Sequence, residues 1–154
     1  MYSKLLGAFV AVSLLAACSS SKTDTSTSTN SAGSAQMSMR DPFAGGAADK
    51  VFFDYDQAVI RDDARSTLDI QADWLNRNKS VSVQIAGDCD ERGTEEYNIA
   101  LGNRRAFAAE SYLAVKGVAP DRMTIISYGK DRPLAPGSTE EAWAQNRNAI
   151  TSVR

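Results

Sequence analysis

Charged and polar side chains gather in one part of the chain, in residues 88–93 and in the segment that follows. Asp90 lies in the first segment, and Asn98, Leu101 and Arg105 lie in the second. The offsets from 98 to 101 to 105 are three and seven residues, so on a helix these side chains share one face. A carboxylate, an amide and a guanidinium at one pocket mouth suit a zwitterionic ligand, whose own carboxylate would meet Arg105.

A second polar pair, Tyr55 and Asp56, follows an apolar run earlier in the chain. Ligands of open sheets usually sit where the carboxyl ends of strands meet, and both polar segments are predicted to follow strands. The ammonium of the ligand would then meet Asp90 or Asp56. The alternative is an Asp–Arg pair that only fixes loop to helix, because ion pairs with a structural role are common.

Hydrophobic patterning predicts the elements that must position these side chains. Apolar residues alternate with polar ones in strands and recur at helical spacing in helices. Thr94 is the expected N-cap of the middle helix and Gly117 its C-terminal stop, and residues 138–141 have capping-box spacing. The order βαβαβαβ predicts an α+β fold, a two-layer sandwich of sheet and helices. Strands are expected at residues 51–55, 81–87, 123–128 and 150–153, and helices at 61–78, 94–117 and 138–148.

The absence of histidine from all 154 residues narrows the possible chemistry. Without it there is no Ser-His or Cys-His nucleophilic pair, no His-ligated zinc and no usual proton shuttle at neutral pH. The formal net charge of -2 argues against nucleic acid as a partner, because such binders need a clustered excess of Lys and Arg. We expect no catalytic residue, no metal and no cofactor other than a covalent lipid.

The first eighteen residues predict export and lipid attachment at Cys18. An apolar run over residues 5–17 follows a short basic start and ends in Leu-Ala-Ala before the cysteine. This run is too short for a bilayer, which needs about 20 residues, and is typical of a secretory signal. Leu-Ala-Ala-Cys resembles the bacterial lipobox, where the signal is removed and the cysteine receives S-diacylglycerol and N-acyl groups. The alternative is an ordinary signal peptide cut nearby.

The segment after the cysteine is predicted to be a flexible tether. Ser and Thr dominate up to residue 31 and no hydrophobic periodicity follows, so the segment cannot bury enough apolar surface to offset its ordering entropy. Phe43 is expected to touch the domain edge only loosely. No aspartate stands beside Cys18, which indicates the outer membrane in bacteria that sort lipoproteins by that neighbour. The expected divisions are a signal peptide at 1–17, the lipidated cysteine and tether at 18–49, and a domain at 50–154.

Residues 87–106 resemble the peptidoglycan-binding segment of the OmpA-like domain family. They read Gly-Asp-Cys-Asp-Glu-Arg-Gly-Thr-Glu-Glu-Tyr-Asn-Ile-Ala-Leu-Gly-Asn-Arg-Arg-Ala, and the similarity extends over residues 50–153. The resemblance implies a mixed sheet of four strands with helices on one face. It also implies non-covalent binding of meso-diaminopimelate in the stem peptide, with an Asp holding the ammonium and an Arg the carboxylate. The residues implied are Tyr55, Asp56, Asp90, Asn98, Leu101 and Arg105.

Within this family the similarity is greatest to the lipoproteins of the Tol-Pal system, which implies a place of action. The implied partners are the peptidoglycan stem peptide, TolB and, as a further candidate, TolA. The lipid on Cys18 would hold the protein in the outer membrane of a Gram-negative cell, with the domain facing the periplasm. The implied role is to tether that membrane to the cell wall, supporting envelope integrity and outer-membrane constriction during cell division.

Two positions depart from the family pattern. Asp88 stands where the family most often has histidine, and Asn148 stands where an arginine is common. If the strand continues, Asp88 and Asp90 point the same way, and like charges that close disfavour ionisation. Whether this strengthens or weakens the hold on an ammonium is open at this point. Cys89, between the two, is interpreted as a small buried side chain rather than a redox centre.

Several arginine and aromatic residues are not expected to contact the ligand. Adjacent helix residues point about 100° apart, so only one of Arg104 and Arg105 can face the pocket, and the register favours Arg105. Trp74, Trp143 and Tyr112 are interpreted as packing residues or partial caps.

Three functional hypotheses stand beside one another. The first is a lipoprotein that binds the cell wall and is not an enzyme. The second is a peptidoglycan-processing enzyme that uses Asp88, Asp90 or Glu91, because paired carboxylates act as acid and base in glycosidases. The third is a lipoprotein that mainly docks Tol components and whose Asp–Arg pair is structural.

Overall fold

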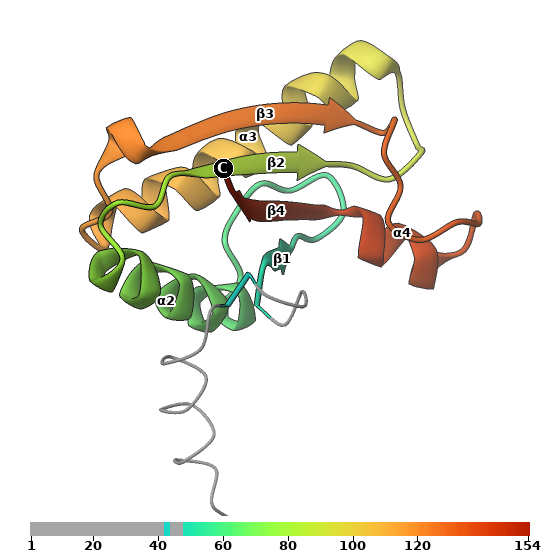
Figure 1. Ribbon diagram of the computed structural model, residues 1–154. Coiled ribbons are helices and arrows are strands. Elements are labelled where there is room, and N and C mark those ends of the chain that lie inside the picture. Colours follow the sequence, from blue (N-terminus) through green and yellow to red (C-terminus); the bar gives the residue numbers. More distant parts are fainter. Residues whose placement is uncertain (1–41, 44–47) are drawn as a thin grey trace, which may run out of the picture.

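The computed structural model describes residues 42–43 and 48–154, and in them two helices cover one face of a four-stranded sheet (Figure 1). The strand order is β1-β4-β2-β3, with β2 parallel to β3 and with β4 antiparallel to β1 and β2. The predicted α+β fold with a mixed sheet is confirmed. The elements are β1 (Lys50–Phe52), α2 (Asp62–Arg77), β2 (Val83–Asp88), α3 (Glu95–Val115), the short helix η2 (Pro120–Arg122), β3 (Met123–Gly129), α4 (Glu140–Asn146) and β4 (Asn148–Val153).

The predicted order of strands and helices is confirmed, and the differences lie at the ends of elements. β1 stops at Phe52, earlier than predicted, and β4 already starts at Asn148. Thr139 caps α4 in place of Ser138, since its hydroxyl accepts a hydrogen bond from the Ala142 amide at 3.3 Å. Figure 1 shows α4 beyond the start of β4 and not on the covered face of the sheet. α4 is therefore placed to border the edge of the sheet where β1 and β2 end.

An apolar stripe on α2 and the inner side of α3 fill the space over the sheet. The predicted stripe of α2 is buried along its length, at Ala64, Leu68, Ala72 and Leu75. These residues belong to one apolar cluster, so the two helices and the sheet share a single core. The cluster also contains Ala106, Ala109 and Leu113 of α3 and Val51, Val83, Ile85 and Met123 of the sheet.

Two glycines allow α3 to lie directly on β2. A Cβ atom on Gly87 would lie 1.9 Å from the carbonyl oxygen of Gly102, and a Cβ atom on Gly102 would lie 2.2 Å from Ser127 Oγ. Any side chain at either position would clash, so helix and strand pack backbone against backbone. This contact fixes the position at which α3 presents its polar face to the end of β2.

The first described residues pack against α2. The rings of Phe43 and Trp74 meet edge-on with centroids 5.5 Å apart, and the Ala48 amide donates to the Pro42 carbonyl at 3.1 Å. Phe43 packs against the core, a closer contact than the sequence suggests, and Trp74 has the packing role predicted for it. Cys18, the signal and most of the tether lie outside the described residues. No helix in residues 48–154 has the length and apolarity to cross a membrane.

Gly87→Ala should destabilise the domain, because the new methyl group meets the backbone of α3. We expect the free energy of unfolding to fall by about 1–3 kcal/mol, as in overpacked cores, when it is measured by urea denaturation. Gln84→Ala is the control, since Gln84 lies on the opposite face of the same strand; it should change stability by less than about 0.5 kcal/mol. Equal effects of the two substitutions would contradict the close contact of α3 and β2.

Candidate functional site

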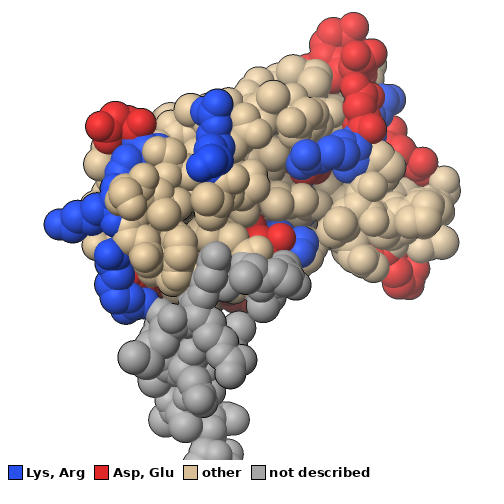
Figure 2. Space-filling model, viewed as in Figure 1, with Lys and Arg blue, Asp and Glu red and all other residues tan. Residues whose placement is uncertain are grey.

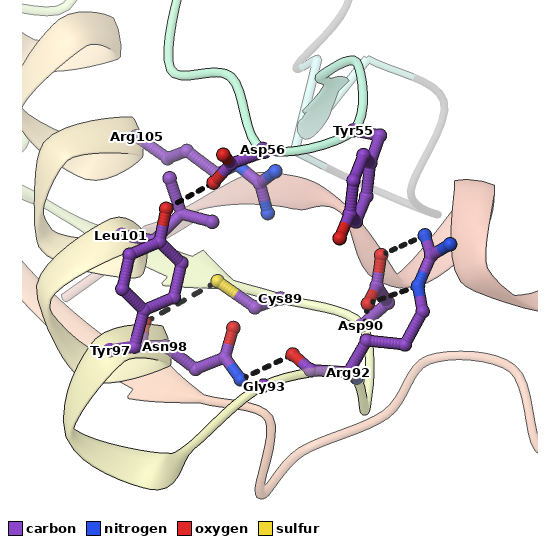
Figure 3. Close-up of a pocket in the computed structure, with 10 residues that line it drawn as sticks. All are labelled: Tyr55, Asp56, Cys89, Asp90, Arg92, Gly93, Tyr97, Asn98, Leu101 and Arg105. Atoms are coloured by element: carbon purple, nitrogen blue, oxygen red, sulfur yellow. Dashed lines mark hydrogen bonds and ion pairs between the residues drawn. The ribbon is translucent and has the colours of Figure 1, made fainter.

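All six predicted binding residues line one pocket, where β1 and β2 end and α3 begins (Figure 3). The chain thus brings together side chains from the turn after β1, the loop after β2 and the first turns of α3. Their roles toward a ligand stay predictions. The lining consists of the predicted Tyr55, Asp56, Asp90, Asn98, Leu101 and Arg105, together with Cys89, Arg92, Gly93 and Tyr97.

Arg105 is the most deeply buried charge of the pocket, with 1% of its surface exposed. Its guanidinium donates to the backbone carbonyl oxygens of Gln57 (2.8 Å), Asp88 (2.9 Å) and Asp54 (3.2 Å). These bonds do not use all of its N–H groups, and no carboxylate of the described residues forms an ion pair with it. Burial lowers the pKa of Arg105, but an arginine stays protonated. The pocket therefore contains a buried positive charge with no anion in contact.

Asn98 and Leu101 complete the face of α3 that borders the pocket, in line with their helical offsets. The Asn98 amide donates to the carbonyl oxygens of Arg92 (2.9 Å) and Thr94 (3.1 Å), which closes the loop before α3. Its side-chain oxygen points into the pocket, and Leu101 forms an apolar wall (Figure 3). Burial raises the pKa of the Cys89 thiol to about 11. Cys89 therefore stays a thiol at neutral pH, which fits the packing role predicted for it.

Tyr55 and Asp56 are the central residues of a tight turn after β1. The Gln57 amide donates to the Asp54 carbonyl at 3.2 Å, and Asp56 has a φ of 56°. Glycine or asparagine is preferred in this left-handed conformation. The Asp56 carboxylate accepts a hydrogen bond from the Tyr97 hydroxyl, and this bond raises the pKa of Tyr97. Within the described residues this is the one side-chain partner of Asp56, so most of its acceptor sites are available to a ligand.

Asp90 is far more completely bound than Asp56. Its Oδ1 accepts from the Arg92 backbone amide (3.1 Å) and Nε (3.0 Å), and its Oδ2 accepts from Arg92 Nη2 (2.8 Å) and Arg147 Nη1 (3.5 Å). A carboxylate has about four acceptor sites, so these bonds use all of them. Burial raises the pKa of Asp90, but the hydrogen bonds from Arg92 and Arg147 outweigh burial and hold it below its ordinary value. An ammonium can therefore bind Asp90 only where a donor has left.

Arg92 lies between two aromatic rings, a position that the sequence reasoning missed. Its guanidinium carbon is 4.2 Å from the ring centroid of Tyr55 and 4.1 Å from that of Trp143. Trp143 also donates from Nε1 to Glu91 at 3.1 Å, so the prediction that Trp143 only packs or caps is incomplete. The family resemblance over residues 50–153 includes α4 but gives no signal for this contact.

Asp88 and Asn148, the two departures from the family pattern, lie directly opposite each other on β2 and β4. Neither lines the pocket. Asp88 is 2% exposed and forms an ion pair with Arg132 at 3.1 Å, so it and Asp90 have different partners. Burial raises the pKa of Asp88, and the Arg132 hydrogen bond opposes this. Asp88 and Asn148 each have a buried side-chain oxygen without a hydrogen-bond partner.

The surroundings of the pocket carry charges of both signs. Arg104 is exposed and its guanidinium lies 5.8 Å from the Tyr97 ring centroid, so Arg105 is the arginine that faces inward, as predicted. On the face in Figure 2, basic and acidic side chains lie next to each other in several places, with uncharged surface between these groups. A ligand is therefore held by local charges and not by a broad field. In the described part of the chain, no group of three or more His, Cys, Asp or Glu residues could hold a metal ion.

The known proteins to which this chain is similar agree with one another. Residues 52–147 match the OmpA family. A protein of Mesorhizobium japonicum named peptidoglycan-associated lipoprotein is 45% identical over 149 residues, which cover 95% of this chain and 89% of that protein. A protein of the same name from Brucella melitensis is 48% identical over 120 residues, which cover 78% of this chain and 71% of that protein.

Solved structures agree with these relatives. The crystal structure of the peptidoglycan-associated lipoprotein from Burkholderia pseudomallei has a TM-score of 0.70 and 37% identity, and the match covers 76% of this chain and 99% of that one. The C-terminal domain of Helicobacter pylori MotB has a TM-score of 0.64, with 69% of this chain and 84% of that chain covered. At 22% identity, the second comparison shows a shared fold only.

Asp88→Asn should remove a pH-dependent cost of folding. Since the pKa of Asp88 lies above its ordinary value near 3.8, the folded chain keeps this proton to higher pH than the unfolded chain. Its contribution to stability is therefore complete below that value and is lost as pH rises. In urea unfolding, the stability of Asp88→Asn relative to the parent chain should increase as the pH is raised from about 3 to about 7.

Asp90→Asn is the control with the opposite sign. The pKa of Asp90 lies below its ordinary value, so its ionised form stabilises the fold at neutral pH and this contribution is lost as pH falls. Asp90→Asn should therefore lose stability relative to the parent chain as pH rises. The same sign for both variants would contradict the separate environments of the two carboxyl groups.

Proposed function

The chain belongs to the OmpA family, and from this premise we propose that it binds peptidoglycan non-covalently through meso-diaminopimelate of the stem peptide. The relatives that support the proposal are named peptidoglycan-associated lipoproteins. The free end of a diaminopimelate side chain carries an ammonium and a carboxylate on one carbon atom. The pocket offers charges of both signs within one cavity, which is the complement that such a group requires.

The observation that carries the proposal is the state of Arg105. In the described residues the buried guanidinium is held by carbonyl oxygens and by no carboxylate, which is costly because a buried charge is normally paired. A carboxylate that entered the pocket would supply the missing anion and use the remaining N–H groups. In a site shielded from water, such a charge-assisted bond is stronger than one between neutral groups.

The ammonium of the same group requires a carboxylate on the other side of the pocket. Asp56 and Asp90 both line it, and they are the two candidates. Asp56 keeps a left-handed backbone that favours glycine, and strain of this kind tends to persist at functional sites. Leu101 and Tyr55 would contact the methylene carbons that join this charged end of the ligand to the rest of the stem peptide.

The cellular role that we propose follows from the lipoprotein relatives and from the N-terminal residues. Lipid on Cys18 would anchor the protein in the outer membrane, and the domain would hold the cell wall from the periplasmic side. This link would support envelope integrity and outer-membrane constriction during cell division. TolB, and TolA as a further candidate, are the proposed protein partners of the Tol-Pal system.

An enzymatic role has less support from the geometry. A glycosidase needs one carboxyl group as acid and another as base or nucleophile, both open to the substrate. Asp88 is buried against Arg132, and Asp90 has its acceptor sites filled. Glu91 is bound to the indole of Trp143. Binding without turnover is the function that these contacts favour.

Arg105→Lys should weaken binding to purified sacculi by about tenfold or more, equal to about 1.4 kcal/mol. Lysine keeps the charge, but it lacks the planar guanidinium group that can donate to three carbonyl oxygens and a carboxylate at the same time. The measurement is sedimentation of the detergent-solubilised full chain with sacculi of diaminopimelate type.

Arg104→Lys is the matched control, because Arg104 is the exposed neighbour on the same helix, and it should bind like the parent chain. If Arg105→Lys sediments with sacculi as well as the parent chain does, the assignment of this pocket as the peptidoglycan site is wrong. Release of muropeptides into the supernatant would favour the hypothesis of a peptidoglycan-processing enzyme. Retention of Tol proteins without any retention by sacculi would favour the docking lipoprotein.

A further inference from the structure

The position of Arg92 has the features of a ligand site that a residue of the protein already fills. Its guanidinium carbon lies 4.2 Å from the ring centroid of Tyr55 and 4.1 Å from that of Trp143. The two rings come from the turn after β1 and from α4, on opposite sides of the loop that carries Arg92. Two aromatic faces around one cation form a general cation-binding arrangement, which is not specific for guanidinium.

Carboxylates close the same space. Asp90 accepts from Arg92 Nε and Nη2 at 3.0 and 2.8 Å, and Glu140 lies 3.8 Å from Arg92 Nη1. We refer to Tyr55, Trp143, Asp90 and Glu140 as the cation cage.

Three of the four members of the cation cage, Asp90, Glu140 and Trp143, are held by contacts that do not involve Arg92. Arg147 donates to Glu140 at 2.8 Å and to Asp90 at 3.5 Å, and it also donates to the Phe53 carbonyl at 3.2 Å. The indole of Trp143 is bound to Glu91 at 3.1 Å. These three side chains should therefore keep their places when Arg92 is absent, which is a condition for the cage to accept another cation.

Arg92 is more accessible to solvent than the two buried side chains beside it, Asp90 and Arg147. Its side chain is 31% exposed, whereas those of Asp90 and Arg147 are 6% and 8% exposed. Gly93 follows it with a φ of 93°. The side chain could leave toward solvent without disturbing the core, and any cation that replaced it would leave the local charge unchanged.

We propose that Arg92 is a built-in competitor of the ligand: its guanidinium occupies the cation cage until the ammonium of the ligand displaces it. The proposal rests on the proposed function for the nature of the ligand. It assigns the ammonium to Asp90 once Arg92 has left, while the carboxylate of the same ligand meets Arg105. Arg92 then lowers the apparent affinity, because only the fraction of molecules with an open cage can bind.

The cage is tested first without any cell-wall ligand. In Arg92→Ala the cage is empty, and methylguanidinium, which matches the missing group, should fill it. We expect millimolar methylguanidinium to raise the melting temperature of the full-length Arg92→Ala chain in detergent and to leave that of the parent chain unchanged. No difference between variant and parent would show that the cage does not accept a free cation, and this would overturn the proposal.

Competition is tested next by calorimetric titration with meso-diaminopimelate. Arg92→Ala should bind at least about threefold more tightly than the parent chain, and methylguanidinium should reduce binding by the variant only. Arg132→Ala is the matched control. Arg132 also stacks on a tyrosine, Tyr128, at 4.0 Å and pairs with an aspartate, Asp88, at 3.1 Å, but it lies outside the pocket lining. Its variant should bind like the parent chain.

The other outcomes are decisive as well. Weaker binding by Arg92→Ala would make Arg92 a ligand contact and overturn the competitor role, and equal binding would show that the cage is not used. If Arg92→Ala does not fold, Arg92→Gln, which keeps more of the side chain but no charge, replaces it in both tests. If no variant binds diaminopimelate but methylguanidinium still stabilises Arg92→Ala, the cage exists and the proposed function has failed.

Discussion

The burial of the Arg105 guanidinium is the constraint on which the site depends. A charge taken out of water must find acceptors, and here they are backbone carbonyl oxygens from the turn after β1 and from the end of β2. One side chain of α3 thereby fixes two segments that are far apart in sequence. The glycine contact between Gly87 and Gly102 brings α3 close enough for this to happen. The pocket is thus a consequence of how closely helix and strand approach.

The charges around the pocket are balanced and local. Within residues 48–154 no carboxylate contacts Arg105, whereas Asp90 is fully bound and Asp56 is nearly open. A simple anion could pair with Arg105, but it would leave the open acceptor sites of Asp56 unused. A zwitterion satisfies both sides at once. The near-neutral net charge of the chain, -2, fits a protein that recognises its ligand through few contacts and without long-range attraction.

The sequence predicted those parts of the site that depend on short spacing. Helical offsets placed Asn98, Leu101 and Arg105 on one face, and the strand–loop–helix order placed Asp90 beside them, because both follow from local geometry. It could not predict that Trp143 of α4 would reach Arg92, since that contact depends on how the chain returns after β3. The sequence also could not show that all acceptor sites of Asp90 are filled. Its partners Arg92 and Arg147 are 55 residues apart, and only the tertiary fold brings them together.

Arg105 is proposed to bind the carboxylate of a zwitterionic cell-wall group. A crystal structure of the chain with meso-diaminopimelate tests this proposal most directly. The account predicts one carboxylate of the ligand within about 3 Å of the Arg105 guanidinium, the distance of a charge-assisted hydrogen bond. A ligand bound elsewhere, with Arg105 still in contact with backbone carbonyl oxygens alone, would contradict it.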